Sequence, residues 1–140
     1  MTGWLAAAVM LVASPQEPQQ SLTPEQVVRI VVEALRANNS PAPNTGIYTA
    51  YRFSSPANHA NTGPYGTFLR IAKHPDFAPL LRESGQTPGP MRVDGDHARQ
   101  IIRVRTRDGT WSEYEFALTR QSGGPCPNCW MVDGVVLSRP

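Results

Sequence analysis

The stretch ARQIIRVRTRDGTWSEYEFAL, residues 98–118, decides the fold, because apolar and charged residues alternate in it on both sides of a turn signal, Asp108-Gly109. Such alternation is typical of two antiparallel strands with one buried face. The predicted inner face is mainly apolar: Ala98, Gln100, Ile102, Val104, Thr106, Tyr114, Phe116 and Leu118. The predicted outer face is mainly charged: Arg99, Ile101, Arg103, Arg105, Arg107, Glu113, Glu115 and Ala117.

The length of the connecting loop decides which residues of this hairpin pair. A two-residue turn at Asp108-Gly109 places Arg103 opposite Tyr114 and mixes the two faces. A three-residue loop over 107–109, with Gly109 left-handed, places Arg103 opposite Glu113 and Ile102 opposite Tyr114. The longer loop keeps one face apolar and pairs opposite charges on the other, so we predict this register.

Signals for helices fill the first half of the chain. Thr23, Pro24 and Gln26 supply an N-cap, a first helical residue and a capping box, and apolar residues recur with helical spacing over 27–35. Further helices are predicted over 44–53 and from an N-cap at Thr62 to the stop at His74-Pro75, with one more turn over 76–81. The intervening residues 54–64 are rich in Ser, Asn, Gly and Pro, which predicts a loop.

Two more strands complete the predicted sheet. Met91 and Val93 precede a tight turn at Gly95-Asp96, and an apolar segment over 130–138 forms the last strand. Helices followed by about four antiparallel strands predict an α+β fold, in which one curved sheet covers the N-terminal helices. We expect residues 21–140 to form this single domain.

The beginning of the chain resembles a targeting segment. Residues 4–13 are an apolar run, too short to span a membrane and suited to the hydrophobic region of a signal peptide. No Lys or Arg precedes the run, so a disordered leader over 1–20 is the alternative. We therefore expect a periplasmic or secreted protein, with a cytoplasmic location as the alternative. A net charge of +2 gives no reason to expect nucleic acid as a partner.

The two cysteines, Cys126 and Cys129, lie in GGPCPNCWMVDGV, residues 123–135. A reactive Cys-x-x-Cys needs a helix N-terminus or a nearby cation, and Cys129 is instead followed by a predicted strand. A zinc site needs four ligands, and no second pair of cysteines is present. Export would make a disulfide within this loop the natural outcome. We predict a disulfide clip, with unpaired structural thiols and a redox or metal pair as the alternatives.

Three stretches of the sequence resemble a family of bacterial and plastid proteins catalogued as a domain of unknown function: YRFSSPANHANTGPYGTFLR (51–70), VDGDHARQ (93–100) and CWMVDGVVL (129–137). More distantly, helices followed by a sheet with a late Trp-x-Val-Asp-Gly strand are similar to the nuclear-transport-factor and ketosteroid-isomerase superfamily. That resemblance implies a cone-shaped, cystatin-like fold whose mouth holds a small molecule, and a homodimer. The closer family has no established catalytic residues, so none is carried over, and the fold analogy implies a pocket without determining an activity.

Six residues are candidates for lining such a pocket: Tyr48, Tyr51, His59, Tyr114, Trp130 and Asp133. By analogy with the isomerases, Asp133 in an apolar pocket would act as a base, whereas the simpler interpretation is a turn or bulge at Asp133-Gly134. His59 lies in the predicted loop, and the aromatic residues would provide polar tips on apolar walls.

Other chemistry finds little support in the sequence. No nucleophile elbow, glycine-rich phosphate loop or two-histidine metal motif occurs, so we expect no cofactor and no metal. The arginines of the predicted outer face are interpreted as a solvated surface paired with Glu113 and Glu115.

Three hypotheses about function follow from these observations. The first is an exported, non-catalytic domain that binds a small apolar or amphipathic ligand or a protein partner. The second is an enzyme of isomerase or dehydratase type that uses Asp133 or His59. The third is an assembly module that dimerises through its sheet.

Overall fold

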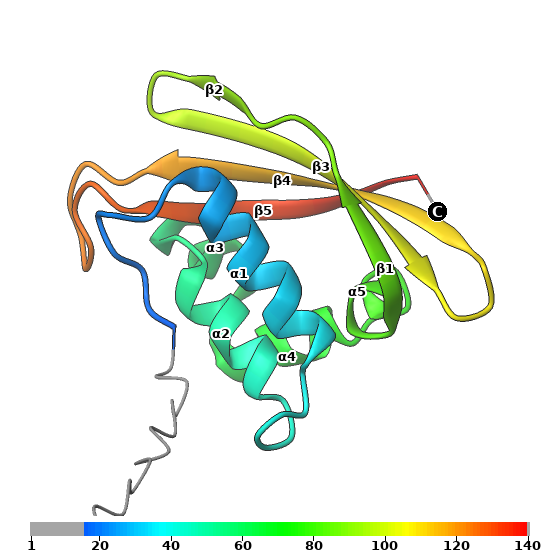
Figure 1. Cartoon of the computed structure of the whole chain (residues 1–140). Coiled ribbons are helices and arrows are strands. Elements are labelled where there is room, and N and C mark those ends of the chain that lie inside the picture. The colour runs from blue at the N-terminus through cyan, green and yellow to red at the C-terminus, as the bar shows by residue number, and fades with distance from the viewer. Residues whose placement is uncertain (1–15, 140) are drawn as a thin grey trace, which may run out of the picture.

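The computed structural model describes residues 16–139 and places a layer of helices against one face of an antiparallel sheet (Figure 1). The helices come first: α1 (Pro24–Arg36), α2 (Thr45–Phe53), α3 (Pro56–Thr62), α4 (Tyr65–Ala72) and α5 (Ala78–Leu81). The strands follow: β1 (Glu83–Pro88), β2 (Arg92–Asp94), β3 (His97–Thr106), β4 (Trp111–Arg120) and β5 (Trp130–Arg139). The α+β class predicted from the sequence is confirmed.

Helix α1 begins where its capping signals predict. The hydroxyl of Thr23 accepts a hydrogen bond from the backbone N–H of Gln26 (3.2 Å), and the side chain of Gln26 accepts one from the N–H of Thr23 (2.9 Å). These two bonds satisfy two of the amides that a helix leaves unpaired at its start. One face of α1 is buried against the sheet and α2: Val27, Val28, Val31, Val32 and Leu35.

The contact between α1 and α2 depends on a glycine and an asparagine. A Cβ at Gly46 would lie 1.9 Å from the carbonyl oxygen of Ala34, so only glycine permits this approach of the two helices. The buried Asn38 accepts a hydrogen bond from the N–H of Ile47 (2.8 Å) through its side chain. This bond satisfies an amide in the first turn of α2 within the protein interior.

The prediction of a loop over 54–64 is wrong, because residues 56–62 form α3. Ser55 is its N-cap and accepts from the N–H of Asn58 (3.1 Å), and Pro56 occupies the first turn. Contacts distant in sequence support the helix, since Asn58 donates to the carbonyl of Val132 (3.1 Å). Thr62 ends α3 and is not the cap of α4, whose N-cap is Pro64.

The central hairpin has the predicted register. Arg103 pairs with Glu113 and Ile102 with Tyr114, and Gly109 in the three-residue loop has a φ of +86°. The sheet order is β1-β3-β4-β5, with β2 also pairing with β3. The sheet has five strands rather than about four because the polar segment β1, which shows no apolar alternation, pairs with β3.

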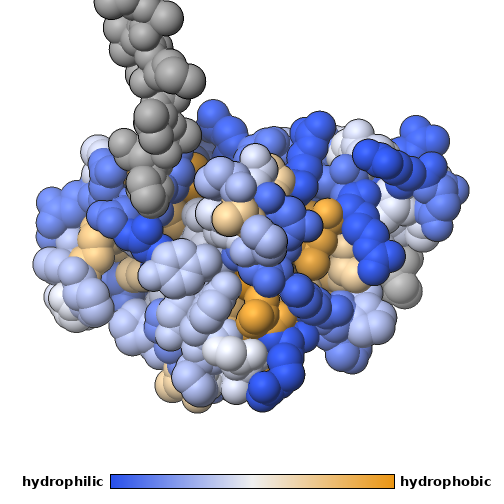
Figure 2. Space-filling view, turned by 90° about the horizontal axis from the view of Figure 1, so that it is seen from below, coloured by the Kyte–Doolittle hydropathy of each residue, from blue (hydrophilic) through white to orange (hydrophobic). Residues whose placement is uncertain are grey.

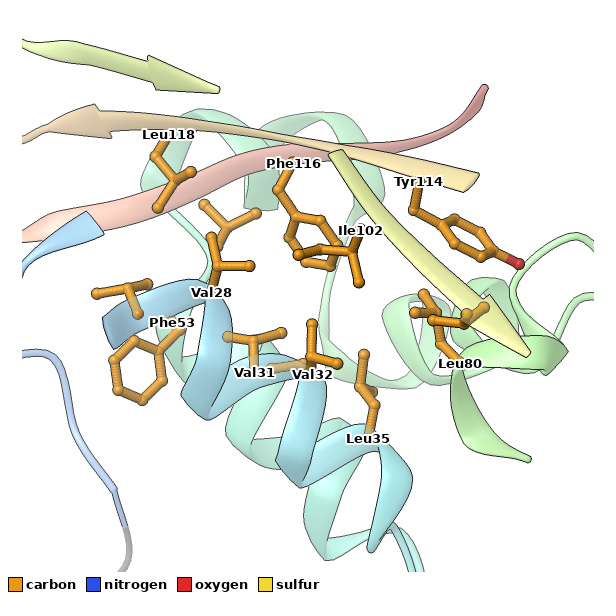
Figure 3. Close-up of a cluster of buried hydrophobic side chains, with 14 of the residues drawn as sticks. Val28, Val31, Val32, Leu35, Phe53, Leu80, Ile102, Tyr114, Phe116 and Leu118 are labelled. Atoms are coloured by element: carbon orange, nitrogen blue, oxygen red, sulfur yellow. The ribbon is translucent and has the colours of Figure 1, made fainter. Parts of the chain in front are cut away.

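The core fills the space between α1 and the sheet. In Figure 3, side chains of α1 such as Val28, Val31 and Val32 point toward Ile102 and Phe116 of the sheet. Tyr114 and Phe116 are 0% exposed, and Ile102 is 2% exposed. Burial of such side chains contributes roughly 1.5–3 kcal/mol each, so this interface is the main source of stability.

The predicted signal peptide falls largely outside the described residues. Residues 16–20, which the sequence assigns to the leader, lie against the domain: Glu17 forms an ion pair with Arg52, and Gln20 donates to the carbonyl of Pro127 (2.9 Å). Within residues 16–139, no helix is both long and apolar enough to span a bilayer.

Candidate functional site

A cavity of about 100 Å³ opens between the helices and β5. All five helices contribute to its lining: Val31 and Leu35 from α1, Ala50 from α2, Asn58 and Thr62 from α3, Phe68, Ile71 and Ala72 from α4, and Leu80 and Leu81 from α5, together with Ser54, Phe77, Val132 and Val135. In Figure 2, which views the molecule from the helical side, hydrophobic side chains gather in the middle of the face and hydrophilic ones surround them.

The wall of this cavity is apolar and contains no acid or base among its lining residues. Its three polar side chains already donate hydrogen bonds to backbone carbonyls: Ser54 to Ala50 (2.8 Å), Asn58 to Val132 (3.1 Å) and Thr62 to Asn58 (2.9 Å). The cavity therefore suits an apolar group, and its lining offers no side chain for proton transfer.

None of the six candidate residues lines the cavity, and the structure separates them into four places. Tyr51 and His59 come together, with stacked rings 4.2 Å apart and Nε2 of His59 2.8 Å from the carbonyl oxygen of Tyr51. Tyr65 joins Tyr48 and Tyr51 edge-on, and burial, followed by the proximity of Tyr48, raises the pKa of Tyr65. These aromatic side chains hold α2, α3 and α4 together.

Tyr114 belongs to the core rather than to a pocket. Its side chain is fully buried, and its hydroxyl donates to the carbonyl of Asp76 (2.6 Å). Burial raises its pKa to about 12, so it stays protonated at physiological pH. Trp130 begins β5 opposite Arg120 and is half-buried against the core.

Asp133 lies in a β-bulge, as the simpler interpretation predicts. Ala117 pairs with Gly134 and Leu118 with Val132, which leaves Asp133 as the extra residue of β5. Its carboxylate accepts hydrogen bonds from the hydroxyls of Ser55 (2.7 Å) and Thr119. Asp133 thus connects the N-cap of α3 to the sheet, and it does so outside the apolar cavity.

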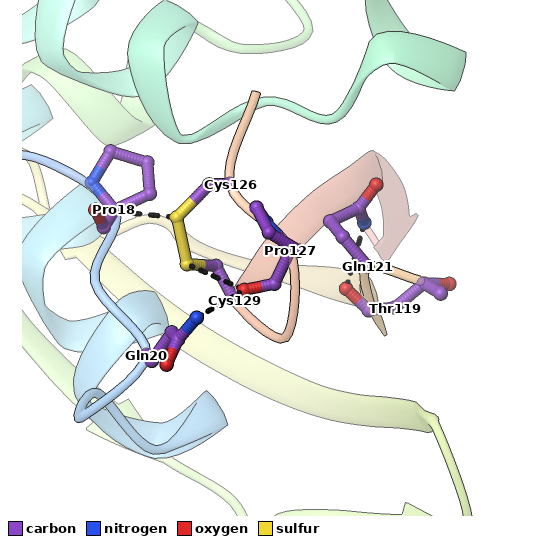
Figure 4. Close-up of a disulfide and its surroundings, with 7 residues drawn as sticks. All are labelled: Pro18, Gln20, Thr119, Gln121, Cys126, Pro127 and Cys129. Carbon is purple, nitrogen blue, oxygen red and sulfur yellow. Dashed lines mark hydrogen bonds between the residues drawn. A yellow bond between two sulfur atoms is a disulfide. The ribbon is translucent and has the colours of Figure 1, made fainter. Parts of the chain in front are cut away.

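Cys126 and Cys129 are joined by a disulfide in the loop before β5 (Figure 4). The N–H of Gln121 donates to the carbonyl of Cys129 (2.9 Å), and the N–H of Asn128 donates back to Gln121 (2.7 Å). The sulfur of Cys126 lies 3.6 Å from the carbonyl oxygen of Pro18. The loop is thereby fixed to the sheet and covered by the segment that precedes α1.

The charged outer face of the sheet has the predicted pairing. Arg99 lies 2.6 Å from Glu115, and Arg103 lies 3.4 Å from Glu113. Arg103 also lies over the ring of Trp111, 4.7 Å from its centroid. These contacts give Arg99 and Arg103 the carboxylate partners that the interpretation of a solvated surface predicts. Arg105 instead lies over the ring of Trp111, 5.7 Å from its centroid.

Sequence reasoning missed the residues that line the cavity and one buried acid, Glu83. The cavity residues have the pattern of ordinary helical core positions, so no sequence signal distinguishes them. Glu83 stands between Arg82 and Ser84 and looks like a surface residue, yet it is only 7% exposed. Across residues 16–139, no three His, Cys, Asp or Glu side chains gather as metal ligands.

Comparison of the chain with models of protein families, with curated proteins and with solved structures finds no match. The resemblance to the domain of unknown function, and the more distant one to the isomerase superfamily, therefore stay predictions, as does a cystatin-like fold. What the structure itself supplies is an apolar cavity in an α+β fold.

Proposed function

We propose that this chain is a non-catalytic binding domain whose cavity takes the apolar end of a small amphipathic ligand. The observation that carries the proposal is the cavity itself, which opens between the helices and β5 and has no titratable lining residue. An apolar cavity without proton donors or acceptors for chemistry favours binding over the isomerase hypothesis.

The size of the cavity limits the ligand. About 100 Å³ is less than the roughly 300–1,000 Å³ of pockets that enclose a whole drug-sized molecule. Apolar cavities of about 150 Å³ bind a molecule such as benzene. At about 100 Å³ this cavity is smaller than that, so the bound group is a short alkyl chain, and the polar part of the ligand stays at the opening.

Export belongs to the same proposal. The apolar run over 4–13 and the disulfide in the loop before β5 both fit a protein that matures in an oxidising compartment. A domain there would meet amphipathic molecules from membranes or from the medium. Mass spectrometry of the protein from its native host tests this part, since export by a signal peptide removes roughly the first 13 to 20 residues.

Straight-chain carboxylates from butanoate to decanoate provide the binding test. Isothermal titration should show the affinity rising by about fourfold for each added CH₂, corresponding to about 0.8 kcal/mol of burial, until the cavity is full. A negative heat-capacity change should accompany binding because apolar surface is buried.

Two matched variants locate the binding. Ala72→Phe places a ring into the cavity from α4 and should abolish binding, whereas Ala60→Phe adds the same ring on the exposed side of α3 and should leave it intact. Equal affinities for all chain lengths, or equal losses in both variants, would contradict the proposal.

A further inference from the structure

One edge of the sheet is open along the second half of β5, the last strand (Figure 1). The first half of this edge is covered, because the N–H of Ser55 donates to the carbonyl of Val132 (2.8 Å) and the side chain of Asn58 donates to the same carbonyl (3.1 Å). Among the residues that the structure describes, the backbone of residues 134–139 pairs only with β4. The backbone donors and acceptors on the other side of this segment are therefore free to pair with a further strand.

The backbone groups of Val135 and Leu137 face this open edge. In an antiparallel sheet, successive residues of a strand bond alternately to the neighbour on one side and to the neighbour on the other. The carbonyl of Val132 points away from β4, and the extra residue of the bulge, Asp133, shifts the alternation by one, so the next residues that point outward are 135 and 137. Val136, between them, carries its side chain on the outer face of the sheet, where it is 63% exposed.

The opposite edge of the sheet is protected against such pairing. It consists of β1, which ends with Pro88, and of β2, which is only three residues long. Short strands and prolines are common devices that stop an edge from adding a strand. The second half of β5 has neither, since it reads GVVLSR (134–139), and the bulge at Asp133 leaves residues 135–137 regular. Of the two edges, the one formed by β5 is suited to pairing.

The open segment is complementary to an antiparallel copy of itself. When Val136 of two copies lies on a two-fold axis, Val135 of each copy stands opposite Leu137 of the other. These are the residues whose N–H and carbonyl groups point outward, so each opposed pair exchanges both hydrogen bonds of an antiparallel ladder. The two exposed Val136 side chains meet on the axis and cover each other from water.

Charges favour the same register. Asp133 and Arg139 lie three positions before and three positions after Val136, so each stands opposite the other residue type in the second copy. The carboxylate of Asp133 accepts from two neutral hydroxyls, which leave its charge uncompensated. Arg139 is exposed and forms no ion pair within residues 16–139. Pairing of two copies therefore gives each charge an opposite neighbour.

We propose that the chain forms a symmetric homodimer in which the β5 strands of two copies pair antiparallel about Val136 and join the two sheets into one. The two-fold axis is perpendicular to the sheet, so both helical layers lie on the same side and the charged outer faces stay in contact with solvent. One strand from each copy buries less than the about 1,200 Å² of a stable interface, so the dimer is reversible. This inference is independent of the apolar cavity and of the function proposed for it.

Sedimentation equilibrium of the purified protein tests the proposal. Between concentrations of about 5 and 500 µM, the average mass should rise from that of one chain toward that of two, as mass action requires. A monomer over the whole range would overturn the proposal.

A matched pair of variants separates the edge of the sheet from its face. Val136 and Ile101 flank Glu115 on the outer face, and both are exposed (63% and 42%). Val136→Lys sets two ammonium groups against each other on the axis and should weaken the dimer by about tenfold or more. Ile101→Lys makes the same change on β3, away from the edge, and should leave the dimer intact. Equal losses in both variants would assign the contact to the sheet face, and an unchanged dimer in Val136→Lys would also overturn the proposal.

The charge pair provides a second comparison. Arg139→Glu places like charges opposite each other at both ends of the contact and should weaken the dimer by about threefold or more. Arg92→Glu makes the same change in net charge on the exposed strand β2 and should have little effect. Equal effects of the two variants would contradict the register centred on Val136.

Cross-linking tests this register directly. Two residues that face each other in a non-hydrogen-bonded antiparallel pair have Cα atoms about 4.5 Å apart, within the range of a disulfide. Mild oxidation should therefore link two Val136→Cys chains and leave Ile101→Cys chains separate. Peptide mapping identifies the linked residue, since Cys126 and Cys129 are already joined to each other. Failure of Val136→Cys to link, or equal linking of both variants, would overturn the proposal.

Discussion

The inner and outer faces of the β3–β4 hairpin have the same backbone and the same neighbours in sequence, but they are held by different forces. On the inner face, Ile102, Tyr114 and Phe116 are withdrawn from water against the helices. On the outer face, Arg99 and Arg103 pair with Glu115 and Glu113 in contact with solvent. Burial of apolar area is worth several times more than a solvent-exposed ion pair, so stability resides on the inner face.

A second contrast concerns carboxylates of the same residue type. Glu113 and Glu115 on the outer face each have an arginine partner. Glu83 starts β1 with its side chain buried, and within residues 16–139 its carboxylate oxygens have no hydrogen-bond partner. The outer face of the sheet therefore tolerates charged side chains, because water and opposite charges are available there. At the buried position of Glu83, a charged carboxylate destabilises the fold.

The largest expected effect comes from a charge on the inner face. Ile102→Asp should destabilise the domain by about 4 kcal/mol or more, because it buries an unpaired carboxylate and removes apolar contacts. Urea unfolding followed by circular dichroism measures the loss. An effect as small as that of an outer-face variant would show that the two faces are assigned the wrong way round.

An intermediate effect should come from the titration of Glu83. Its pKa is raised from 4.5 to about 7, chiefly by burial, so the folded state holds the proton more tightly than the unfolded state. The contribution of Glu83 to the free energy of unfolding is therefore largest below pH 4.5 and is lost progressively as the pH rises to about 7.

Chemical denaturation across this pH range measures the decline. Glu83→Gln should remove this part of the pH dependence, whereas Glu115→Gln, which removes a paired carboxylate from the outer face, should keep it. Identical profiles for the wild type and Glu83→Gln would show that Glu83 is not buried as described.

A smaller effect is expected from the cross-link that lies beside the sheet. Replacing both Cys126 and Cys129 by Ser opens only a short loop, so the domain should lose about 2 kcal/mol and keep its ligand binding. Thiol titration of the wild-type protein, unfolded in the absence of reductant, should find no free cysteine. Loss of folding in this variant would place the main source of stability in the loop rather than on the inner face.

The smallest effect should come from the outer face itself. Arg103→Gln removes one exposed ion pair with Glu113 and the contact with Trp111, and should cost less than about 0.5 kcal/mol. The same urea titration as for Ile102→Asp provides the comparison. A loss above about 1 kcal/mol would mean that the arginine contacts stabilise the sheet more than exposed pairs normally do.

The local features of the fold were predictable because their causes are local in sequence. The cap at Thr23 and the left-handed Gly109 act within a few residues, and the alternation around Ile102 fixes the register of the hairpin. The Asp133-Gly134 pair inside a strand predicts a turn or bulge, and the structure has the bulge.

The sequence by itself determined the α+β class, the register of the hairpin and the pairing of its charges, because capping, turn chemistry and alternation are properties of neighbouring residues. Only the tertiary structure decided that residues 56–62 form a helix, since Asn58 and Ser55 find their partners, Val132 and Asp133, more than 70 positions away. Only the tertiary structure also decided where the apolar cavity lies, because its wall comes from helices and a strand that meet only on folding. It likewise decided that Glu83 is buried, because burial, unlike charge or periodicity, depends on which distant parts of the chain pack against a residue.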